Sequence, residues 1–444
     1  MSSRSQRSQR LSGRAAFPTI AVGQTASAFG SSLTLFAIAW TVWSEYRSGS
    51  ALAVLWILVA LVYVIAGPFA GVYVDRWDRR TTMLGADIFS ACIACAAALA
   101  IAVDGFSLVG AYAIVLGLSA ARIFHGPAFA AAIPLLVPDR HLGRANGVVE
   151  FSHGGSRLAA PAIGGLLLAA GLDLRHILLL DALTFALAAV SLALVRVPQV
   201  PAHESRDAAT SWLRGLTADV SAGFRYVWTR RGLFWLLMLF ATVNLLGSGI
   251  NVLLPQIVTL KFDAGSGLFG AMEAAMGAGV LVGALVMIVW AGPRSRVAGI
   301  LIGLAIGAFF QLATGLVPWA PAAVIALGCA VTAWLIVNTI QTSLFQTAVA
   351  PGMQGRVFAL RRTLEQFTWP VSSLAAGLLS PTLVRPDVLL ALGGVAMLVA
   401  VAVAASSPSV RALTREWRSN AAGTADVPVT AANQLARAPE QAQD

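Results

Sequence analysis

Charged side chains are rare in this sequence, and several lie inside long apolar runs where they can carry protons or bind ions. Charged residues make up 11% of the 444 residues and hydrophobic residues 58%. A carboxylate in such a run can take up and release a proton, and an arginine there needs a partner or water. The acids in apolar runs are Asp87, Asp181, Glu273 and Glu365, and the arginines are Arg122 and Arg157.

These acids differ in the partners that the sequence offers them. Glu365 follows Arg361 by four residues, which predicts a local ion pair on one helix. Glu273 has no charged partner in its own apolar run, so it is our first candidate for protonation or for binding a cationic ligand. Asp181 is the second candidate.

The segment after residue 149 places polar groups at helical spacing. Glu150, Arg157, Pro161 and Gly164 recur at intervals of three or four residues, with His153 between the first two, so they share one helix face. Glu150 and Arg157 are two turns apart, about 10 Å. This spacing predicts a path for protons or charge toward Arg122 and His125, and a static ladder of salt bridges explains it equally well.

The elements that must position these residues are membrane-spanning helices. A mean hydropathy of +0.78 exceeds what a water-soluble particle can bury, and about 20 apolar residues cross the hydrocarbon core. The fold class predicted is an all-α membrane protein with twelve transmembrane helices. The predicted spans are 17–43, 51–74, 81–103, 107–137, 144–171, 175–196, 232–260, 265–291, 297–317, 320–350, 357–383 and 386–406.

The distribution of basic residues predicts the topology. With the N-terminus in the cytoplasm, most of the 30 Lys and Arg residues fall in cytoplasmic segments. The outside loops hold only Arg47, Arg175, Lys261 and Arg385. We therefore expect both termini in the cytoplasm and a multi-pass protein of the cell membrane. The net charge of +10 does not indicate nucleic-acid binding, because the arginines form short clusters between apolar runs.

The chain divides into two six-helix halves. We expect a basic cytoplasmic N-terminus at 1–16, an N-terminal half at 17–196, a cytoplasmic central loop at 197–231, a C-terminal half at 232–406 and a disordered cytoplasmic tail at 407–444. The second part of the central loop, SWLRGLTADVSAGFRYVWTR, fits an amphipathic helix on the membrane interface or an ordinary linker equally well.

The two halves resemble each other, since PDRHLGRANG and PGMQGRVFAL both place Pro and then Gly-Arg before a span. Pro161 and Gly165 likewise have counterparts in Pro370 and Gly377. A duplicated, pseudo-symmetric six-helix unit is the architecture expected of alternating access.

A charged stretch, GPFAGVYVDRWDRR, lies in the predicted loop between the second and third spans. Its residues Gly71, Asp75, Arg76, Arg79 and Arg80 resemble the loop signature of the major facilitator superfamily, G-x-x-x-D-R-x-G-R-R, with Asp78 in place of the usual glycine. The resemblance implies a gating latch, in which the arginines bridge to carboxylates or helix C-termini. Plain anchoring of positive charge inside the cell is the alternative.

Two more motifs resemble this superfamily. Arg122-x-x-x-Gly126 matches its fourth-helix motif, which implies a role for Arg122 in proton coupling; a structural ion pair is the alternative. GSRLAAPAIGG resembles the fifth-helix motif of antiporters, with Ala160 in place of a glycine. It implies that the bend at the proline and the thin packing of its glycines form a pivot. The pivot residues are Gly155, Pro161, Gly164 and Gly165.

The runs ARIFHGPAFAAAIPLLVPDRHLGRANG and QTSLFQTAVAPGMQGRVFAL resemble the branch of macrolide-efflux and enterobactin-exporter-like transporters. This branch implies proton antiport of macrolides, other drugs or siderophores. Amide and aromatic groups at helical spacing are our candidates for the substrate cavity. They are Gln24, Asn244, Asn251, Trp334 and Asn338.

We therefore predict a major facilitator transporter that exports an amphipathic small molecule against inward proton flow. The substrate, protons and the lipid bilayer are its expected partners, with no cofactor and no metal. A lipid or nutrient importer of the same fold is the alternative, and a non-transporting scaffold or sensor leaves the latch without purpose. A membrane enzyme is disfavoured because the sequence lacks the P-loop, H-E-x-x-H and G-x-S-x-G motifs.

Overall fold

The computed structural model describes residues 16–138, 141–198, 221–290 and 292–412. Within these ranges the side chains of residues 68–69, 71–76, 351–352 and 366 are not described. The predicted basic N-terminus, most of the predicted central loop and most of the predicted tail thus lie outside the described residues.

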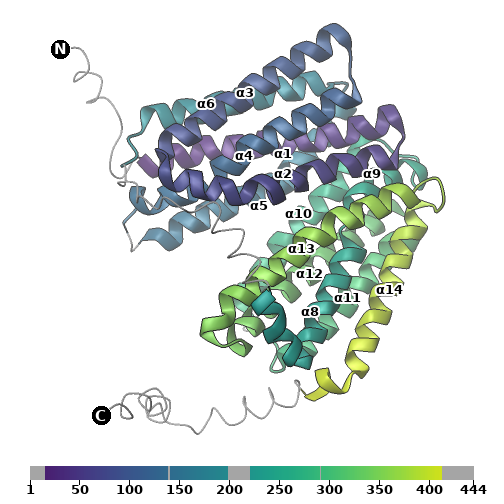
Figure 1. Cartoon of the computed structure of the whole chain (residues 1–444). Coiled ribbons are helices and arrows are strands. Elements are labelled where there is room, and N and C mark those ends of the chain that lie inside the picture. Colours follow the sequence, from purple (N-terminus) through teal and green to yellow (C-terminus); the bar gives the residue numbers. More distant parts are fainter. Residues whose placement is uncertain (1–15, 139–140, 199–220, 291, 413–444) are drawn as a thin grey trace, which may run out of the picture.

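The chain folds into long helices joined by short connections (Figure 1). In the first half these are α1 (Ala16–Tyr46), α2 (Gly49–Arg76), α3 (Arg79–Asp104), α4 (Leu108–Leu136), α5 (Leu142–Ala169) and α6 (Leu174–Leu194). In the second half they are α8 (Arg231–Gly247), α9 (Ile250–Leu260), α10 (Ser266–Val289), α11 (Arg296–Leu316), α12 (Ala320–Ala348), α13 (Pro351–Leu379) and α14 (Pro386–Ser406).

Local sequence signals set several helix ends. Asp78, Ser107 and Ser295 cap the N-termini of α3, α4 and α11 with their side-chain oxygens. Proline occupies the first turn of α12, α13 and α14, where its missing N–H has no cost. Gly105 ends α3 with a φ of 79°, a conformation that favours glycine.

The predicted span 232–260 is wrong as one continuous helix. The structure breaks it at Ser248 and Gly249 into α8 and α9. Neighbouring helices hold this break, because a Cβ on Gly247 would lie 2.8 Å from Trp334 and one on Gly249 would lie 3.0 Å from Ala376. Such close packing favours glycine at both positions.

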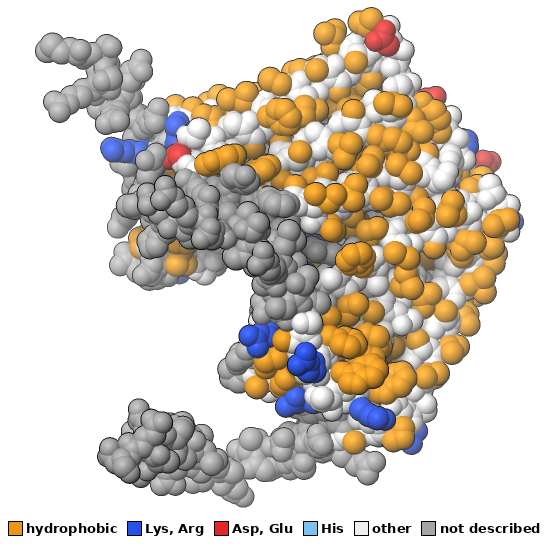
Figure 2. Space-filling view, in the orientation of Figure 1, with side chains coloured by type: hydrophobic (Ala, Val, Ile, Leu, Met, Phe, Trp, Pro, Cys, Tyr) orange, Lys and Arg blue, Asp and Glu red, His pale blue; other side chains and the backbone are white. Residues whose placement is uncertain are grey.

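Ten helical segments are long and apolar enough to cross a membrane, with α8 and α9 counted together. The two other long helices, α5 and α13, have 28 and 29 residues and carry more charge. Charged side chains lie toward the ends of the bundles in Figure 2, and hydrophobic side chains cover the surface between them. The chain is therefore an all-helical membrane protein, with ten spans by composition and two more polar helices packed among them.

The helices form two bundles, α1–α6 and α8–α14, which meet at one end and diverge toward the end where both chain termini lie (Figure 1). Figure 2 shows a hollow between the bundles on the side of the termini. One cluster of buried apolar residues crosses from the first bundle to the second, and it includes Phe36, Trp43, Leu253 and Phe269. The bundles are thus joined by a shared core at the end away from the termini.

Two predicted non-helical segments contain helix. Residues 408–412 are helical, so the predicted disordered tail is wrong at its start. Residues 221–229, in the predicted central loop, are also helical. Val227 of this helix is buried and its Trp228 is 58% exposed, so one side of the helix packs against the protein.

Candidate functional site

The candidate site is the space between the bundles, closed at one end by glycine contacts. Gly165 of α5 packs against Gly270 of α10, where an added Cβ would lie 3.0 Å from the Gly270 Cα. At the second contact, Gly49 of α2 faces Gly377 of α13, where an added Cβ would lie 3.0 Å from the Gly377 carbonyl oxygen. The two contacts occupy corresponding places in the two halves, as expected of a duplicated unit.

The predicted pivot residues contribute directly to this closed end. Pro161 and Gly164 are buried, and a Cβ on Gly164 would lie 2.7 Å from the Phe36 ring. The Pro161 carbonyl faces Gly270, and Ser266 donates a hydrogen bond of 3.2 Å to the Gly165 carbonyl oxygen. Gly155, in contrast, has open space beside it. Pro161, Gly164 and Gly165 therefore form the packed part of the motif, and Gly155 does not.

The polar face predicted on α5 is exposed in the structure. Glu150, His153 and Arg157 are all exposed, as is Arg122 on the neighbouring α4. Each of Arg122, Glu150 and Arg157 lies close enough to His153 to affect its charge. Within the described ranges these side chains form no ion pair. Three of the residues named for proton coupling, Arg122, Glu150 and Arg157, thus lie around His153, and among the described residues they do not form a closed salt-bridge ladder.

Asp87 of α3 makes a buried contact that the sequence did not reveal. Gln24 Nε2 of α1 donates a hydrogen bond of 3.1 Å to Asp87 Oδ2, and His125 Nε2 of α4 lies 3.5 Å from Asp87 Oδ1. Asp87 is 2% exposed and Gln24 is 8% exposed. Gln24 was predicted to line the substrate cavity, but in the structure its amide donates a hydrogen bond to this buried carboxylate.

Asp181 of α6 is fully buried against α1. Thr34 Oγ1 donates to its Oδ2 at 2.7 Å and Thr184 Oγ1 donates to its Oδ1 at 3.2 Å. Gly30 makes this approach possible, because any Cβ there would collide with both Thr184 and Asp181. Hydroxyl donors rather than a cation thus hold this carboxyl group, although Arg122 is within electrostatic range.

Glu273 of α10 has no hydrogen bond or ion pair to another described residue. It is partly buried and lies on the helix that packs against α5 and α12. A carboxyl group without a partner in such a position favours the neutral form in the absence of a ligand. Glu273 therefore stays the first candidate for protonation.

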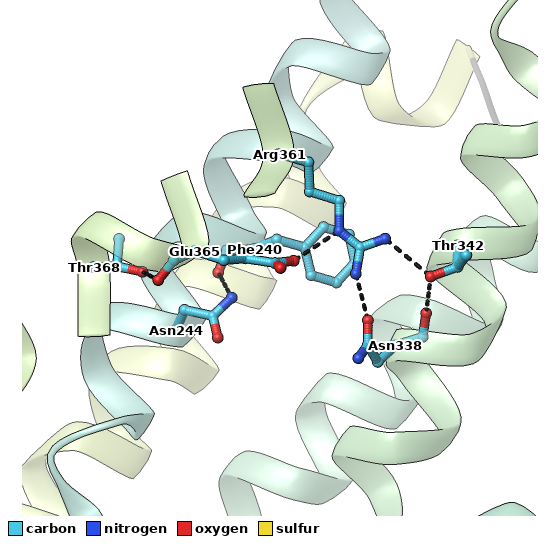
Figure 3. Close-up of polar contacts among 7 residues, drawn as sticks. All are labelled: Phe240, Asn244, Asn338, Thr342, Arg361, Glu365 and Thr368. Atoms are coloured by element: carbon cyan, nitrogen blue, oxygen red, sulfur yellow. Dashed lines mark hydrogen bonds and ion pairs between the residues drawn. The ribbon is translucent and has the colours of Figure 1, made fainter. Parts of the chain in front are cut away.

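In the described part of the second half, Arg361 is the centre of a polar network (Figure 3). Its Nε donates to Glu365 Oε1 at 2.7 Å, which is the predicted local pair. Its Nη1 donates to Thr342 Oγ1 at 2.9 Å and its Nη2 donates to Asn338 Oδ1 at 2.5 Å. The network therefore ties α13 to α12 through a guanidinium whose three nitrogens are all engaged.

The other predicted cavity residues occupy different environments. Asn338 is exposed and accepts from Arg361, whereas Trp334 is half-buried and its Nε1 has no partner among the described residues. Asn244 donates to the Phe240 carbonyl oxygen at 3.2 Å and Asn251 donates to the Ser248 carbonyl oxygen at 3.5 Å. Both asparagines flank the break between α8 and α9.

The charged loop between α2 and α3 is described only in part, since the surroundings of Gly71 and the side chains of Asp75 and Arg76 are not described. Arg79 Nη1 donates to the Ala131 carbonyl oxygen of α4 at 2.7 Å. Arg80 donates to the carbonyl oxygens of Leu192, Ala193 and Val195 at 2.8–3.0 Å. These contacts tie the start of α3 to α4 and to the C-terminus of α6, all within one half.

Asp78 stands in place of the glycine of the motif, and it has a structural role that we did not predict from the sequence. Its Oδ1 accepts from the Thr81 amide at 2.6 Å and from the Thr81 hydroxyl at 2.7 Å. An aspartate directly before a helix is the usual signal for such a cap.

An apolar groove of about 670 Å³ runs between α1 and α5 on the first bundle. Phe29, Phe151, Ser152 and Ser156 are among its lining residues. A hydrogen bond of 2.7 Å between Thr25 and Ser152 joins the two helices at this groove. A groove of this size and character suits a bulky, largely apolar molecule.

Comparison with known proteins decides the family. Residues 20–373 match the model of a protein family that is described as the Major Facilitator Superfamily. The chain belongs to that superfamily. It is therefore a multi-pass membrane transporter for a small molecule and not an enzyme.

Its similar curated relatives include efflux proteins of bacteria. Macrolide efflux protein A of Streptococcus pyogenes is 27% identical over 367 residues, which cover 82% of this chain and 88% of the relative. Multidrug efflux pump Tap of Mycobacterium tuberculosis (strain ATCC 25618 / H37Rv) is 28% identical over 376 residues, which cover 79% and 84%.

Solved structures agree on the fold. A bacterial homolog of the human lysosomal transporter Spinster superposes with a TM-score of 0.63 at 13% identity, covering 91% of this chain and 96% of that one. The nucleoside transporter NupG gives a TM-score of 0.66 at 12% identity, covering 88% and 98%. This superfamily member thus has the fold predicted from its sequence.

Proposed function

We propose that this transporter exports an amphipathic small molecule across the cell membrane, coupled to inward proton movement. The observation that carries the proposal is the arrangement of the bundles. Glycine contacts join them at the end away from the termini, and a hollow opens at the end of the termini. With both termini in the cytoplasm, this is the state that would load a substrate from inside the cell.

The relatives support export rather than import. Both are named as efflux proteins, and each is covered by this chain over more than four-fifths of its length. Macrolides and other bulky drugs are the substrate class that these names favour for this chain. The groove between α1 and α5 supports the same class, because its lining is mostly apolar.

Proton coupling is supported by two sets of groups. Arg122, Glu150, His153 and Arg157 lie together at the exposed face of the first bundle, and Glu273 lies without a partner in the second. Inward movement of one proton down a potential of 100 mV releases about 2.3 kcal/mol. That energy is available to close the cytoplasmic end and open the other.

The test is proton flux in inside-out vesicles that contain the protein. A macrolide, a cationic dye and a catecholate siderophore are added in turn after the vesicle interior has been acidified. We expect at least one of them to dissipate the acid interior in a protein-dependent way. If none does and downhill uptake of a ligand still occurs, facilitated import becomes the better assignment.

A further inference from the structure

The Arg361 network leaves one negatively charged group available to a ligand. All three guanidinium nitrogens of Arg361 donate to side chains of α12 and α13, and the Arg361 side chain is 11% exposed. Glu365 uses Oε1 for this pair, its Oε2 accepts from no other described residue, and its side chain is 40% exposed. An anion cannot reach Arg361 without breaking these bonds, whereas a cation can reach Glu365.

Glu365 does not point toward lipid. Arg361, Glu365 and Trp369 follow one another at intervals of four residues, so they share one face of α13. The opposite face carries exposed apolar side chains, which are Phe367, Val371, Leu374 and Leu378. Because those residues form the lipid-facing surface, the exposed part of Glu365 faces the interior between the helices.

Aromatic rings lie one turn from Glu365 on the same face. Trp369 of α13 packs against Trp56 of α2 with ring centroids 6.1 Å apart, so this pair joins the two bundles. Figure 3 shows Asn244 on the side of Glu365 away from Arg361, and its helix α8 packs against α13. A carboxylate oxygen, indole rings and an amide are the groups that bind an organic ammonium ion.

We propose that Glu365 binds the ammonium group of a positively charged, amphipathic amine, with Trp369 and Trp56 against its apolar part. This inference rests on the proposed export function and specifies its substrate class. Arg361 acts as a positioning residue, because its bond to Oε1 fixes the rotamer that presents Oε2. The hydrogen bonds from Arg361 to Asn338 and Thr342 hold the guanidinium charge away from the ligand.

The experiment compares two ligands that differ at one nitrogen, which is positively charged in the first and neutral in the second. One is a macrolide with a tertiary amine, and the other is its N-demethyl, N-acetyl derivative, which is neutral. Equilibrium binding of each radiolabelled ligand is measured on the full-length protein in lipid nanodiscs. The variants are Glu365→Gln, which removes the charge at nearly constant size, and Glu365→Asp, which keeps the charge.

A charge-assisted hydrogen bond in such a site makes an affinity difference of about tenfold. We expect Glu365→Gln to weaken binding of the amine about tenfold and to change binding of the neutral derivative less than twofold. Glu365→Asp should recover part of the loss. The control is Asp263→Asn, which removes one negative charge at an exposed position outside the helices and should leave the amine-to-neutral affinity ratio unchanged.

The outcomes separate this inference from the export function. Equal weakening of both ligands by Glu365→Gln would show that Glu365 only supports the helix packing, and it would overturn the proposal. Equal affinity of the wild-type protein for both ligands would overturn it too, while leaving macrolide export intact. If the wild-type protein bound neither ligand, the proposed substrate class would be wrong, and the proposed preference for a charged ligand would be wrong too.

Discussion

Gly165 and Gly270 face each other backbone to backbone where α5 crosses α10, with 3.0 Å between the Cα of either residue and a Cβ added to the other. Beside this crossing, the stacked rings of Phe36 of α1 and Phe269 of α10, whose centroids are 4.6 Å apart, also join the two bundles. Alternating access requires this crossing to open, so its packing sets the stability of the conformation seen here.

A larger side chain at Gly165 should therefore impair transport. In Gly165→Val the added Cβ alone would meet the Ser266 carbonyl oxygen at 2.6 Å. Overpacking of this kind costs about 1–3 kcal/mol, which shifts the population of a two-state protein by about tenfold or more. We expect the efflux rate of reconstituted protein to fall by at least about that factor.

Gly267→Ala is the matched control, because it lies one turn from Gly270 on α10 and an added Cβ there meets nothing within 4 Å. It should retain wild-type transport. Normal transport by Gly165→Val, at equal expression and with an unchanged elution profile, would show that the crossing tolerates separation and is not the closed gate.

Asp78 should contribute to stability as the N-cap of α3. Replacement of an N-cap Asp by Ala costs about 1 kcal/mol and replacement by Gly only a few tenths. Thermal unfolding in one detergent should thus rank wild type above Asp78→Gly and Asp78→Gly above Asp78→Ala. A melting temperature for Asp78→Ala equal to that of the wild type would contradict the capping role.

Lys261 provides a test of membrane orientation, because it is the only lysine in the chain and follows α9 at the end away from the termini. Its Nζ donates to the carbonyl oxygens of Thr314 and Gly315 at 3.2 and 2.7 Å. Burial lowers the pKa of the Lys261 ammonium below 10.5, the nearby Asp387 raises it, and Arg385 lowers it. A larger fraction is therefore uncharged and reactive near pH 9 than for a free lysine.

A membrane-impermeant amine reagent applied to intact cells should consequently label the protein, and labelling should rise with pH. Lys261→Arg should remove the labelling. The N-terminal amine would be the only primary amine left, and in the proposed topology it lies on the cytoplasmic side, where the reagent cannot reach it. Persistent labelling of Lys261→Arg in intact cells would place the N-terminus outside and reverse the proposed topology.

Glu273 should couple transport to protons. In Glu273→Gln the group can no longer take up or release a proton, while its size is almost unchanged. We expect ligand-driven proton flux to disappear while downhill ligand movement continues. Asp263→Asn makes the same change of charge at an exposed site outside the helices and should behave as wild type. Unchanged proton flux in Glu273→Gln would remove this residue from the coupling mechanism.

The long helices were predictable because most of them have a local signal in the sequence. Apolar runs of the right length predicted the membrane helices, and the pairing of Arg361 with Glu365 followed from a spacing of four. The Pro and Gly residues that recur in the two halves likewise indicated two corresponding helices, α5 and α13. Gly165 and Gly377 of these helices join the bundles.

Contacts between distant segments were not predictable in the same way. Gln24 and Asp87 are 63 residues apart in the sequence, and no periodicity in either helix indicates that they form a hydrogen bond. The pairing of Trp56 with Trp369 has the same character, since it depends on how the two bundles dock. The break after Gly247 was missed because Gly-Ser-Gly within an apolar run is also common in continuous membrane helices.

The polarity of α13 also has a consequence for how the protein is made. An arginine at the centre of a lone membrane helix costs roughly 2.5–3.5 kcal/mol to insert, and α13 carries Arg361, Arg362 and Glu365. Asn338 and Thr342, which receive two of the Arg361 hydrogen bonds, belong to α12, the helix synthesised just before. The ribosome thus makes the hydrogen-bond acceptors of α12 before it makes Arg361. The two helices α12 and α13 are therefore suited to leave the translocon for lipid together, as a hairpin.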